Sequence, residues 1–391
     1  MTSNHSGERT ADPIRSGRYS HRRITLTRLY EDRPVRMSSL LQRWHEMATA
    51  LKRLRQSLRG GPGHRGARSD HFDGERFFNL GASAGKSMAD LWRWRRTRSP
   101  QPWPQWREYH AVPQLPASLT ADEIAITFVN HVTFLIQVGA LTLMCDPVYS
   151  LRASPVSWAG PRRVHAPGLP FEQLPHIDLV FVSHNHYDHM DLPTLKRLAR
   201  THAPVFLTGL GNGAFLREQG IAQVLELDWW QQTQARGAQL AFTPAQHWST
   251  RGPGNRNRTL WGGLWLTSGS RSLYFSGDTG YAPLFAEVRR HYGQPDVALL
   301  PIGAYEPRWF MRDQHMNPEE AVRAHLTLGA HTSIACHFGC FQLADEGIDE
   351  PLVDLRQACA AHGVAATEFY APQPGETLIW RAGPRSLHVV A

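Results

Sequence analysis

The segment FVSHNHYDHMD, residues 181–191, places three histidines and two aspartates directly behind an apolar run. His184 and His186 form a His-x-His pair that aims two imidazoles the same way, and Asp188 and His189 offer a carboxylate and a third imidazole to a second point nearby. Imidazole nitrogens and carboxylate oxygens are ligands of zinc. Four ligands divided into two pairs do not complete one tetrahedral site, so the segment favours two adjacent metal ions.

Two ions need more ligands, and the later sequence supplies them where apolar segments end. His247 ends AFTPAQH, Asp278 ends LYFSGD, and His337 ends SIACH. One such histidine is more often a structural polar residue, but three residues in the order His, Asp, His behind H-x-H-x-D-H indicate a set. Because side chains after buried strands gather at the carboxyl edge of a sheet, the sequence predicts a dinuclear metal centre there.

The elements that must position these residues begin near residue 120. Segments rich in β-branched and aromatic residues predict strands, and two segments at 318–329 and 350–363 predict helices. A further helix is expected at 191–200 with Asp191 as its N-cap. Strands with helices between them indicate stacked sheets covered by helices. The predicted strands are 123–130, 133–139, 141–147, 177–183, 203–209, 222–230, 238–245, 260–269, 271–278, 297–303 and 332–339.

The residues before this region read differently. Residues 1–36 are polar and aperiodic and predict disorder, whereas 37–58 predict a basic amphipathic helix headed by Met37, a credible alternative start. This helix would pack on the domain, on the partner in a homodimer, or on a membrane surface. Residues 60–69 predict a flexible linker, so the expected organisation is an N-terminal extension, 1–69, and a hydrolase domain, 70–391.

A second Arg/Trp-rich segment, residues 90–106, suits a membrane interface or an extended strap that caps the fold. The chain has a net charge of +8, but the excess of arginine lies in the first 110 residues or so, outside the predicted core. We therefore expect no nucleic-acid partner. The sequence contains neither a continuous apolar run of about 18 residues nor a signal-peptide pattern. The C-x-x-x-C pair Cys336 and Cys340 has no partner pair, so we expect free thiols and a cytoplasmic location.

The ligand order H-x-H-x-D-H, His, Asp, His resembles the metallo-β-lactamase superfamily, whose fold is an α/β protein with an αββα four-layer sandwich. Beyond the ligands, the chain from about residue 70 onward resembles the N-acylphosphatidylethanolamine-hydrolysing phospholipases D and their bacterial relatives. The most specific of these motifs are PIGAYEPRWFM and QHMNPEEAVRAH. The other matching motifs are SHNHYDHMD, LELDWW, TPAQHWS and SGDTGY.

This resemblance implies two Zn²⁺ ions per chain and a role for each ligand. One ion would be held by His184, His186 and His247. The second would be held by Asp188, His189 and His337, with Asp278 bridging the two. A hydroxide between the ions is expected to be the nucleophile, since a shared metal pair lowers the pKa of water toward neutrality.

The resemblance also places Gln314 and His315 at the phosphate of the substrate. His315, expected to be catalytic together with Asp188 and Asp278, would donate a hydrogen bond or a proton to the leaving alkoxide, although a helix-capping role for the pair stays open. We expect Tyr187 on the substrate side. Asp146 is a candidate to orient a ligand imidazole, against an ordinary Asp-Pro turn.

His131 is a candidate neighbour of the site, and Cys336 is expected to be a buried filler. The aromatic stretches 228–230 and 306–310 either line an apolar path for acyl chains or pack in the core.

The expected function is a dizinc phosphodiesterase of the phospholipase D type that cleaves N-acylphosphatidylethanolamine to N-acylethanolamine and phosphatidic acid. Because this substrate lies in a bilayer, we expect a peripheral contact with a phospholipid membrane. Three alternatives remain: a lactonase or soluble phosphodiesterase of the same fold, a nuclease, and a binding protein with an inactive site.

Overall fold

The computed structural model describes residues 61–81, 86–382 and 385–390. The predicted disorder over 1–36 and the predicted helix over 37–58 lie outside these residues. The strands are β1 (Glu123–Asn130), β2 (Thr133–Val138), β3 (Leu141–Cys145), β4 (Leu179–Val182), β5 (Val205–Gly209), β6 (Val224–Leu227), β7 (Gln232–Ala235), β8 (Ala238–Thr243), β9 (Gly263–Ser268), β10 (Arg271–Phe275), β11 (Val297–Pro301), β12 (Thr332–Cys336), β13 (Phe369–Tyr370), β14 (Thr377–Ala382) and β15 (Arg385–Val390). The helices are α2 (Met88–Thr97), the 3-10 helix η2 (Phe171–Gln173), α3 (Leu192–Thr201), α4 (Gly213–Glu218), α5 (Leu284–Tyr292), α6 (Arg308–Met311), α7 (Pro318–Leu328) and α8 (Glu350–His362).

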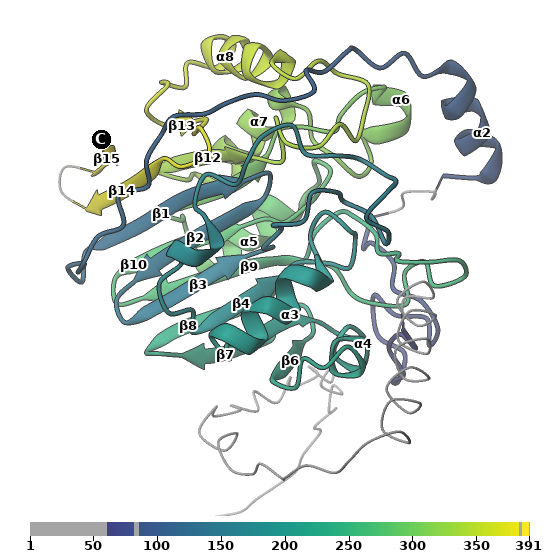
Figure 1. The fold of residues 1–391 in the computed structure, drawn as a ribbon, viewed down its shortest axis with the longest axis horizontal. Coiled ribbons are helices and arrows are strands. Elements are labelled where there is room, and N and C mark those ends of the chain that lie inside the picture. The colour runs from purple at the N-terminus through teal and green to yellow at the C-terminus, as the bar shows by residue number, and fades with distance from the viewer. Residues whose placement is uncertain (1–60, 82–85, 383–384, 391) are drawn as a thin grey trace, which may run out of the picture.

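Two mixed sheets form the centre of the molecule (Figure 1). One has eight strands in the order β15-β14-β1-β2-β3-β4-β5-β6, and the other has seven in the order β13-β12-β11-β10-β9-β8-β7. One apolar cluster joins residues of both sheets, a second joins the seven-stranded sheet to α5, α7 and α8, and a third joins the eight-stranded sheet to α3 and α4. These clusters define four layers, so the predicted αββα sandwich is confirmed.

The unbroken apolar strands follow from this layering. In β4, Leu179 and Phe181 face the other sheet, while Val180 and Val182 face the helices. A strand buried on both faces needs apolar residues at every position, because its side chains alternate between the faces. The sequence IDLVFVS therefore lacks the polar alternation of a half-exposed strand.

The strand directions bring the ends of separate segments to one edge. β3 and β4 are parallel, as are β10, β11 and β12. β8 and β10 both pair antiparallel with β9, so they also run in one direction. The loops after β4, β8, β10 and β12 carry the predicted metal ligands, and parallel strands place their carboxyl ends at the same edge.

Asp191 lies where it is expected, but its side chain makes different contacts. It stands at the N-cap position of α3, but its side chain makes no capping hydrogen bond. Instead its carboxylate accepts hydrogen bonds from the backbone N–H groups of Tyr149 and Ser150 and from the hydroxyls of Ser150 and Thr194. Asp191 thus fastens the 149–150 loop to the start of α3.

The segments before β1 lie against the sandwich. The backbone N–H of His64 donates to the carbonyl of Arg258 at 2.7 Å, and the His64 ring packs against Phe72 and Phe77. Residues 61–69 therefore contact the domain, and the expectation of a free linker is wrong for them. The domain boundary at residue 69 stays a prediction.

The strap interpretation of 90–106 is confirmed over its second half. The indole N–H of Trp103 donates to the carbonyl of Glu346 at 2.9 Å, and Arg98 pairs with Asp345. In α2, Trp94 stacks on Phe310, whereas Trp92 is 58% exposed. Among the described residues, no helix combines the length and apolarity needed to cross a bilayer.

Candidate metal centre

The loop that follows β4 contains four of the predicted ligands within a single turn of the backbone. His184, His186, Asp188 and His189 lie within residues 183–190, where the backbone N–H groups of His189 and Met190 both donate to the carbonyl of His186. His247, Asp278 and His337 arrive from the loops after β8, β10 and β12. The structure brings all seven side chains to the common edge of the two sheets.

The first cluster contains only imidazoles. His186 Nδ1 lies 2.8 Å from His184 Nε2 and 3.3 Å from His247 Nε2. Two nitrogens bound to one zinc at 2.0–2.1 Å with tetrahedral angles are about 3.3 Å apart. The spacing of these three nitrogens therefore suits one shared ion.

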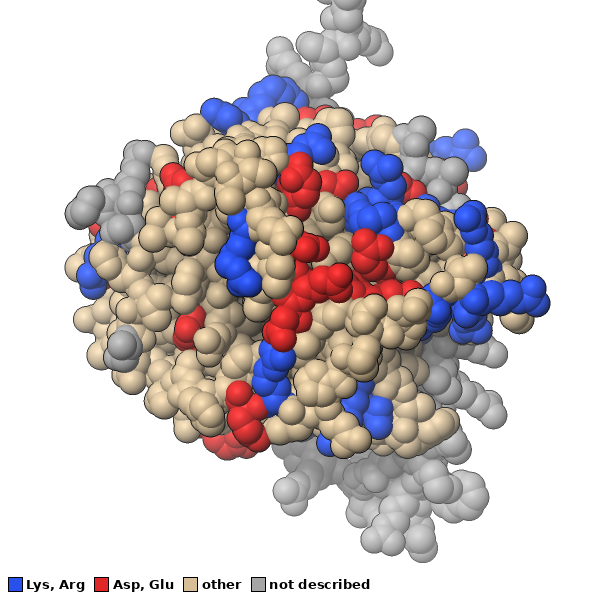
Figure 2. All heavy atoms as spheres, turned by 90° about the horizontal axis from the view of Figure 1, so that it is seen from above, with Lys and Arg blue, Asp and Glu red and all other residues tan. Residues whose placement is uncertain are grey.

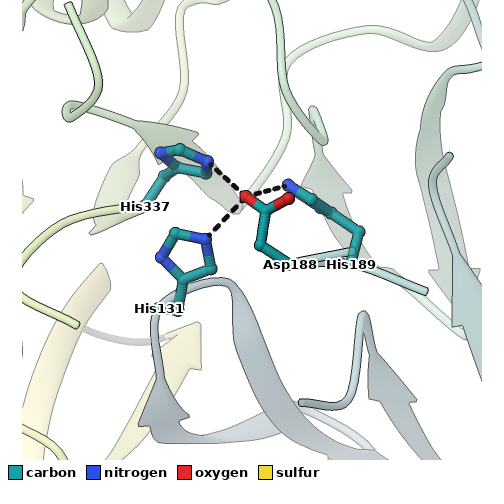
Figure 3. A group of neighbouring side chains, drawn as sticks. All are labelled: His131, Asp188, His189 and His337. Carbon is teal, nitrogen blue, oxygen red and sulfur yellow. Dashed lines mark hydrogen bonds and ion pairs between the residues drawn. The ribbon is translucent and has the colours of Figure 1, made fainter. Parts of the chain in front are cut away.

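The second cluster is centred on the Asp188 carboxylate, to which three imidazoles point (Figure 3). Asp188 Oδ2 lies 3.4 Å from Nε2 of His189, 3.4 Å from Nε2 of His337 and 3.1 Å from Nε2 of His131. His131 comes from the turn between β1 and β2, so its expected place beside the site is confirmed.

Asp278 lies between the two clusters. Its Oδ2 is 3.1 Å from Nε2 of both His189 and His337 and 3.8 Å from Nε2 of His247. A single carboxylate oxygen thus faces histidines of both sets, as a bridging ligand must. Gly277, with φ 61°, supplies the left-handed turn that directs Asp278 inward.

The hydrogen bonds around the clusters fix which nitrogens carry protons. His189 Nδ1 pairs with Asp146 Oδ2 at 2.7 Å, and His247 Nδ1 pairs with the carbonyl of Gln314 at 3.0 Å. Both partners are acceptors only, so each Nδ1 carries the hydrogen. The Ser183 hydroxyl donates to Asp146 and therefore accepts from His184 Nδ1. All three histidines consequently direct Nε2 into the site, and Nε2 is the nitrogen through which each would bind a metal ion.

The expected hydrogen bond between Asp146 and a predicted ligand imidazole is confirmed. The backbone of Asp146, like those of His131 and His337, is left-handed, with φ of 39°, 47° and 59° respectively. Non-glycine residues rarely adopt this conformation, and such strain concentrates at functional sites.

The electrostatics of the centre divide the histidines into two groups. Burial lowers the pKa of His186 and of His247 to about 3 and keeps both neutral. At His337, burial is outweighed by the Asp278 and Asp188 carboxylates, which raise the pKa to about 9. The pKa of Asp278 is lowered: burial opposes this, but His189 and His337 overcome it. The carboxylates of the second cluster therefore favour positive charge on their neighbours, and the donor set is consistent with a binuclear metal site.

The predicted substrate-side residues lie around this centre. His315 Nδ1 is 3.9 Å from Asp278 Oδ2, and its ring lies between those of His247 and His337. That Nδ1 is buried and has no hydrogen-bond partner among the described residues. Gln314 reaches the site through its carbonyl, which accepts from His247. The capping role belongs instead to Asn317, whose side chain caps α7.

Tyr187 forms part of a cavity of about 580 Å³ beside the metal centre. Its hydroxyl donates to the carbonyl of Arg251 at 2.6 Å, and the Arg251 guanidinium lies 4.2 Å from the centre of its ring. The remaining wall is largely apolar. It is formed by Ala153, Pro155, His186, Asp188, Trp248, Thr250, Arg251, Gly252, Pro253 and Leu343.

The aromatic stretches 228–230 and 306–310 do not line this cavity. Trp229 and Cys336 belong to the core between the sheets, so the packing interpretation holds for Trp229 and the filler role of Cys336 is confirmed. Sequence reasoning missed Trp248 and Ser183. Trp248 packs edge-on against the His186 ring, with 4.5 Å between the ring centroids, and it lines the cavity. The available signal was adjacency, because Trp248 directly follows His247 and Ser183 directly precedes His184.

Known proteins are similar to this chain in sequence and in fold. Residues 142–338 match the family described as the beta-lactamase superfamily domain. The chain is 38% identical over 273 residues to an uncharacterised protein of Mycobacterium tuberculosis, and the match covers 68% of this chain and 72% of that protein. It is 34% identical over 287 residues to N-acyl-phosphatidylethanolamine-hydrolyzing phospholipase D 1 of Caenorhabditis elegans, and this match covers 68% of this chain and 80% of that protein. Among solved structures, an isothiocyanate hydrolase from Delia radicum gut bacteria has the same fold. Its TM-score is 0.53 at 20% identity, and the match covers 66% of this chain and 99% of that one.

Proposed function

This chain belongs to the metallo-β-lactamase superfamily, and from that premise we propose that it is a dizinc phosphodiesterase of the phospholipase D type acting on N-acylphosphatidylethanolamine. The observation that carries the proposal is the position of Asp278 Oδ2, which faces imidazoles of both clusters. The matched residues 142–338 include all seven proposed ligands. Zinc ions bound there would act as Lewis acids and lower the pKa of water.

The proposed assignment of ligands follows the distances. His184, His186 and His247 hold the first ion, and Asp188, His189 and His337 hold the second, with Asp278 shared. Asp146, Ser183 and the carbonyl of Gln314 keep three of these imidazoles in the binding tautomer. Each ion thereby receives ligands whose orientation is set before it binds.

In the proposed reaction, water adds to phosphorus and the bond between phosphorus and the ethanolamine oxygen breaks. The products are phosphatidic acid and N-acylethanolamine, whose oxygen takes up a proton. His315 Nδ1 lies 3.9 Å from Asp278 Oδ2 and has no hydrogen-bond partner within the described part of the chain, and burial lowers the pKa of His315 to about 3. We assign His315 to this leaving oxygen as a neutral hydrogen-bond donor, with Gln314 and Tyr187 beside the substrate.

The wall of the cavity supports an amphiphilic substrate. Ala153, Pro155, Trp248, Pro253 and Leu343 offer apolar contact directly beside His186 and Asp188. Such a wall suits acyl chains attached to a phosphodiester that sits at the metal centre. Since these lipids reside in bilayers, we propose peripheral membrane association on the cytoplasmic side, through residues 37–58 and the Trp92 side of α2. The alternative role for residues 37–58 is to form the interface of a homodimer.

The nuclease alternative has less support. Figure 2 shows acidic side chains gathered near the centre of the face seen there, with basic side chains scattered around them. This face therefore presents no continuous basic surface for a phosphate backbone. The lactonase alternative shares the metal centre, so only a substrate comparison separates it from the proposal.

A lipid screen tests the proposed function. Purified zinc-loaded protein is offered N-acylphosphatidylethanolamine, phosphatidylcholine, a lactone and a bis-aryl phosphodiester, and products are identified by mass spectrometry. We expect the highest kcat/KM for N-acylphosphatidylethanolamine, with N-acylethanolamine and phosphatidic acid formed in equal amounts. A higher kcat/KM for the lactone, or release of a fatty acid instead, contradicts the proposal. The Asp278→Asn variant serves as the background control.

A further inference from the structure

The described segment before α2 reaches the metal centre through one side chain, Asn79. Phe72 and Phe77 of this segment pair through a β-bridge, and both are 1% exposed within the core between the sheets. The backbone N–H of Phe77 donates to the carbonyl of Asn257 at 2.7 Å. These contacts fix the chain two residues before Asn79.

The Asn79 amide pairs with both backbone groups of a single residue, His247. Asn79 Nδ2 donates to the carbonyl of His247 at 2.9 Å, and the N–H of His247 donates to Asn79 Oδ1 at 3.2 Å. The indole N–H of Trp261 also approaches Asn79 Oδ1 at 3.2 Å, while donating to the carbonyl of Ala245 at 2.9 Å. The amide therefore pairs with His247 as a neighbouring strand would.

His247 needs such a partner because it lies beyond the end of a strand. β8 ends at Thr243, so the ladder to β9 does not pair the backbone of His247. Buried backbone groups without partners are costly, and unpaired ones leave a loop free to shift. At the other end of the residue, the ring is held by the carbonyl of Gln314. The position of His247 Nε2 is thus set by two contacts, one on the backbone and one on the ring.

We propose that Asn79 is a positioning residue that holds His247 in place for the first metal ion. The inference rests on the proposed function only for the ligand role of His247. It also implies that the unit able to bind metal tightly includes the described segment before α2. Phe72 and Phe77 contribute core packing, whereas the Asn79 amide holds the backbone of His247 directly through its own hydrogen bonds.

Stepwise metal titration of the full-length chain tests this role. Metal-free wild type, Asn79→Leu and Asn79→Ala are titrated with zinc against a chromophoric chelator, and cobalt(II) absorption is recorded in parallel. Leucine retains the volume of asparagine without its hydrogen bonds. We expect one of the two binding steps to weaken about tenfold in both variants, with a changed cobalt spectrum, while the other step keeps its affinity.

Two further variants separate positioning from general stability. Leu80→Ser changes an exposed neighbour and should leave both steps as in wild type. Phe77→Ala removes core packing without touching the amide, so it should lower the Tm of the metal-free protein yet keep both affinities in the folded fraction. The proposal is overturned if Asn79→Leu binds metal with the affinities of wild type. It is also overturned if Phe77→Ala loses as much metal affinity as Asn79→Leu. The metal titration contains no lipid, so its result does not depend on the substrate. If the lipid screen fails but Asn79→Leu binds zinc about tenfold more weakly, only the proposed substrate is refuted.

Discussion

Asp278 Oδ2 lies 3.1 Å from Nε2 of His189, although the two residues follow strands of different sheets. Asp278 comes after β10 of the seven-stranded sheet, and His189 comes after β4 of the eight-stranded sheet. The metal centre therefore joins the two halves of the sandwich, and its geometry depends on how the sheets pack. Residues that set this contact are the most direct targets for testing the site.

Replacing Asp278 by asparagine should remove the shared negative oxygen while preserving side-chain shape. We expect activity to fall at least about 100-fold and bound metal to fall below two ions per chain. Elemental analysis and kcat/KM measurements on the purified variant report both quantities. Asp296→Asn, at a buried aspartate that pairs with Ser272 and Arg271, is the matched control and should keep its metal. Full metal occupancy in Asp278→Asn would remove the bridging assignment.

Asp146→Asn should weaken the centre without removing a ligand. The carboxylate accepts the Nδ1 proton of His189 and also a hydrogen bond from Ser183. A neutral amide accepts less strongly and allows the imidazole to rotate, so we expect a 10- to 100-fold loss of metal affinity or activity. Chelator competition measures the affinity. Affinity equal to wild type would reduce Asp146 to a structural turn residue.

His315→Ala should separate chemistry from metal binding. Its ring faces Asp278 but belongs to neither metal triad, so we expect kcat to fall about 100-fold while metal content stays unchanged. His315→Gln retains an N–H donor and should recover part of the rate. If His315→Ala instead lost its metal, the residue would be a ligand, and its assignment to the substrate would be wrong.

His71 should make stability depend on pH at a site far along the chain from the ligands. It is buried between Asp228, at 2.7 Å, and Asp70, at 2.6 Å, with Trp229 stacked on its ring. Burial lowers its pKa, but the hydrogen bonds to Asp228 and Asp70 outweigh burial, and the pKa is raised. The folded state thus binds the proton more tightly, so the stabilisation is complete below about pH 6.5 and is lost as pH rises through the folded-state pKa.

Thermal melts of wild type and Asp228→Asn between pH 5 and 9 would show this dependence. The variant keeps an acceptor for His71 but loses the charge, so we expect it to be less stable by about 1 kcal/mol at pH 5. The gap should narrow as the pH rises through the folded-state pKa of His71, because the ring then loses its positive charge. A gap that is constant with pH would mean that His71 is neutral throughout.

Deleting residues 1–60 tests the proposed membrane role of the basic amphipathic segment. The cut is placed at 60 because His64 contacts Arg258 and belongs with the domain. We expect binding to anionic liposomes in sedimentation assays to weaken more than turnover of detergent-solubilised substrate, since each basic residue near such a surface contributes about 1 kcal/mol. Trp92→Ser within the full chain tests the second proposed contact. Unchanged liposome binding after the deletion would exclude the segment from membrane contact.

Much of the centre could be read from the sequence. His184, His186, Asp188 and His189 are close in space because they are close in the chain, and a buried strand before them fixes where they emerge. The order of His247, Asp278 and His337 behind them identified the family, and alternation between two buried faces made the strands recognisable as apolar runs. These features depend on local pattern, which the sequence carries directly.

Other features depend on contacts between distant segments. Nothing near Asn79 marks it as a partner of His247, 168 positions later, and nothing near Asp146 fixes its hydrogen bond to His189. Asp191 lies at the predicted N-cap position, but its side chain does not cap α3, because the 149–150 loop, brought close by the fold, offers hydrogen-bond donors to its carboxylate.

The sequence by itself thus determined the ligand types, their order and the sheets that carry them. Only the tertiary structure decided which nitrogen of each histidine faces the centre and which side chains hold it there. The reason is physical: imidazole tautomers and loop positions are set by hydrogen bonds to whatever the packing of two sheets brings within about 3 Å.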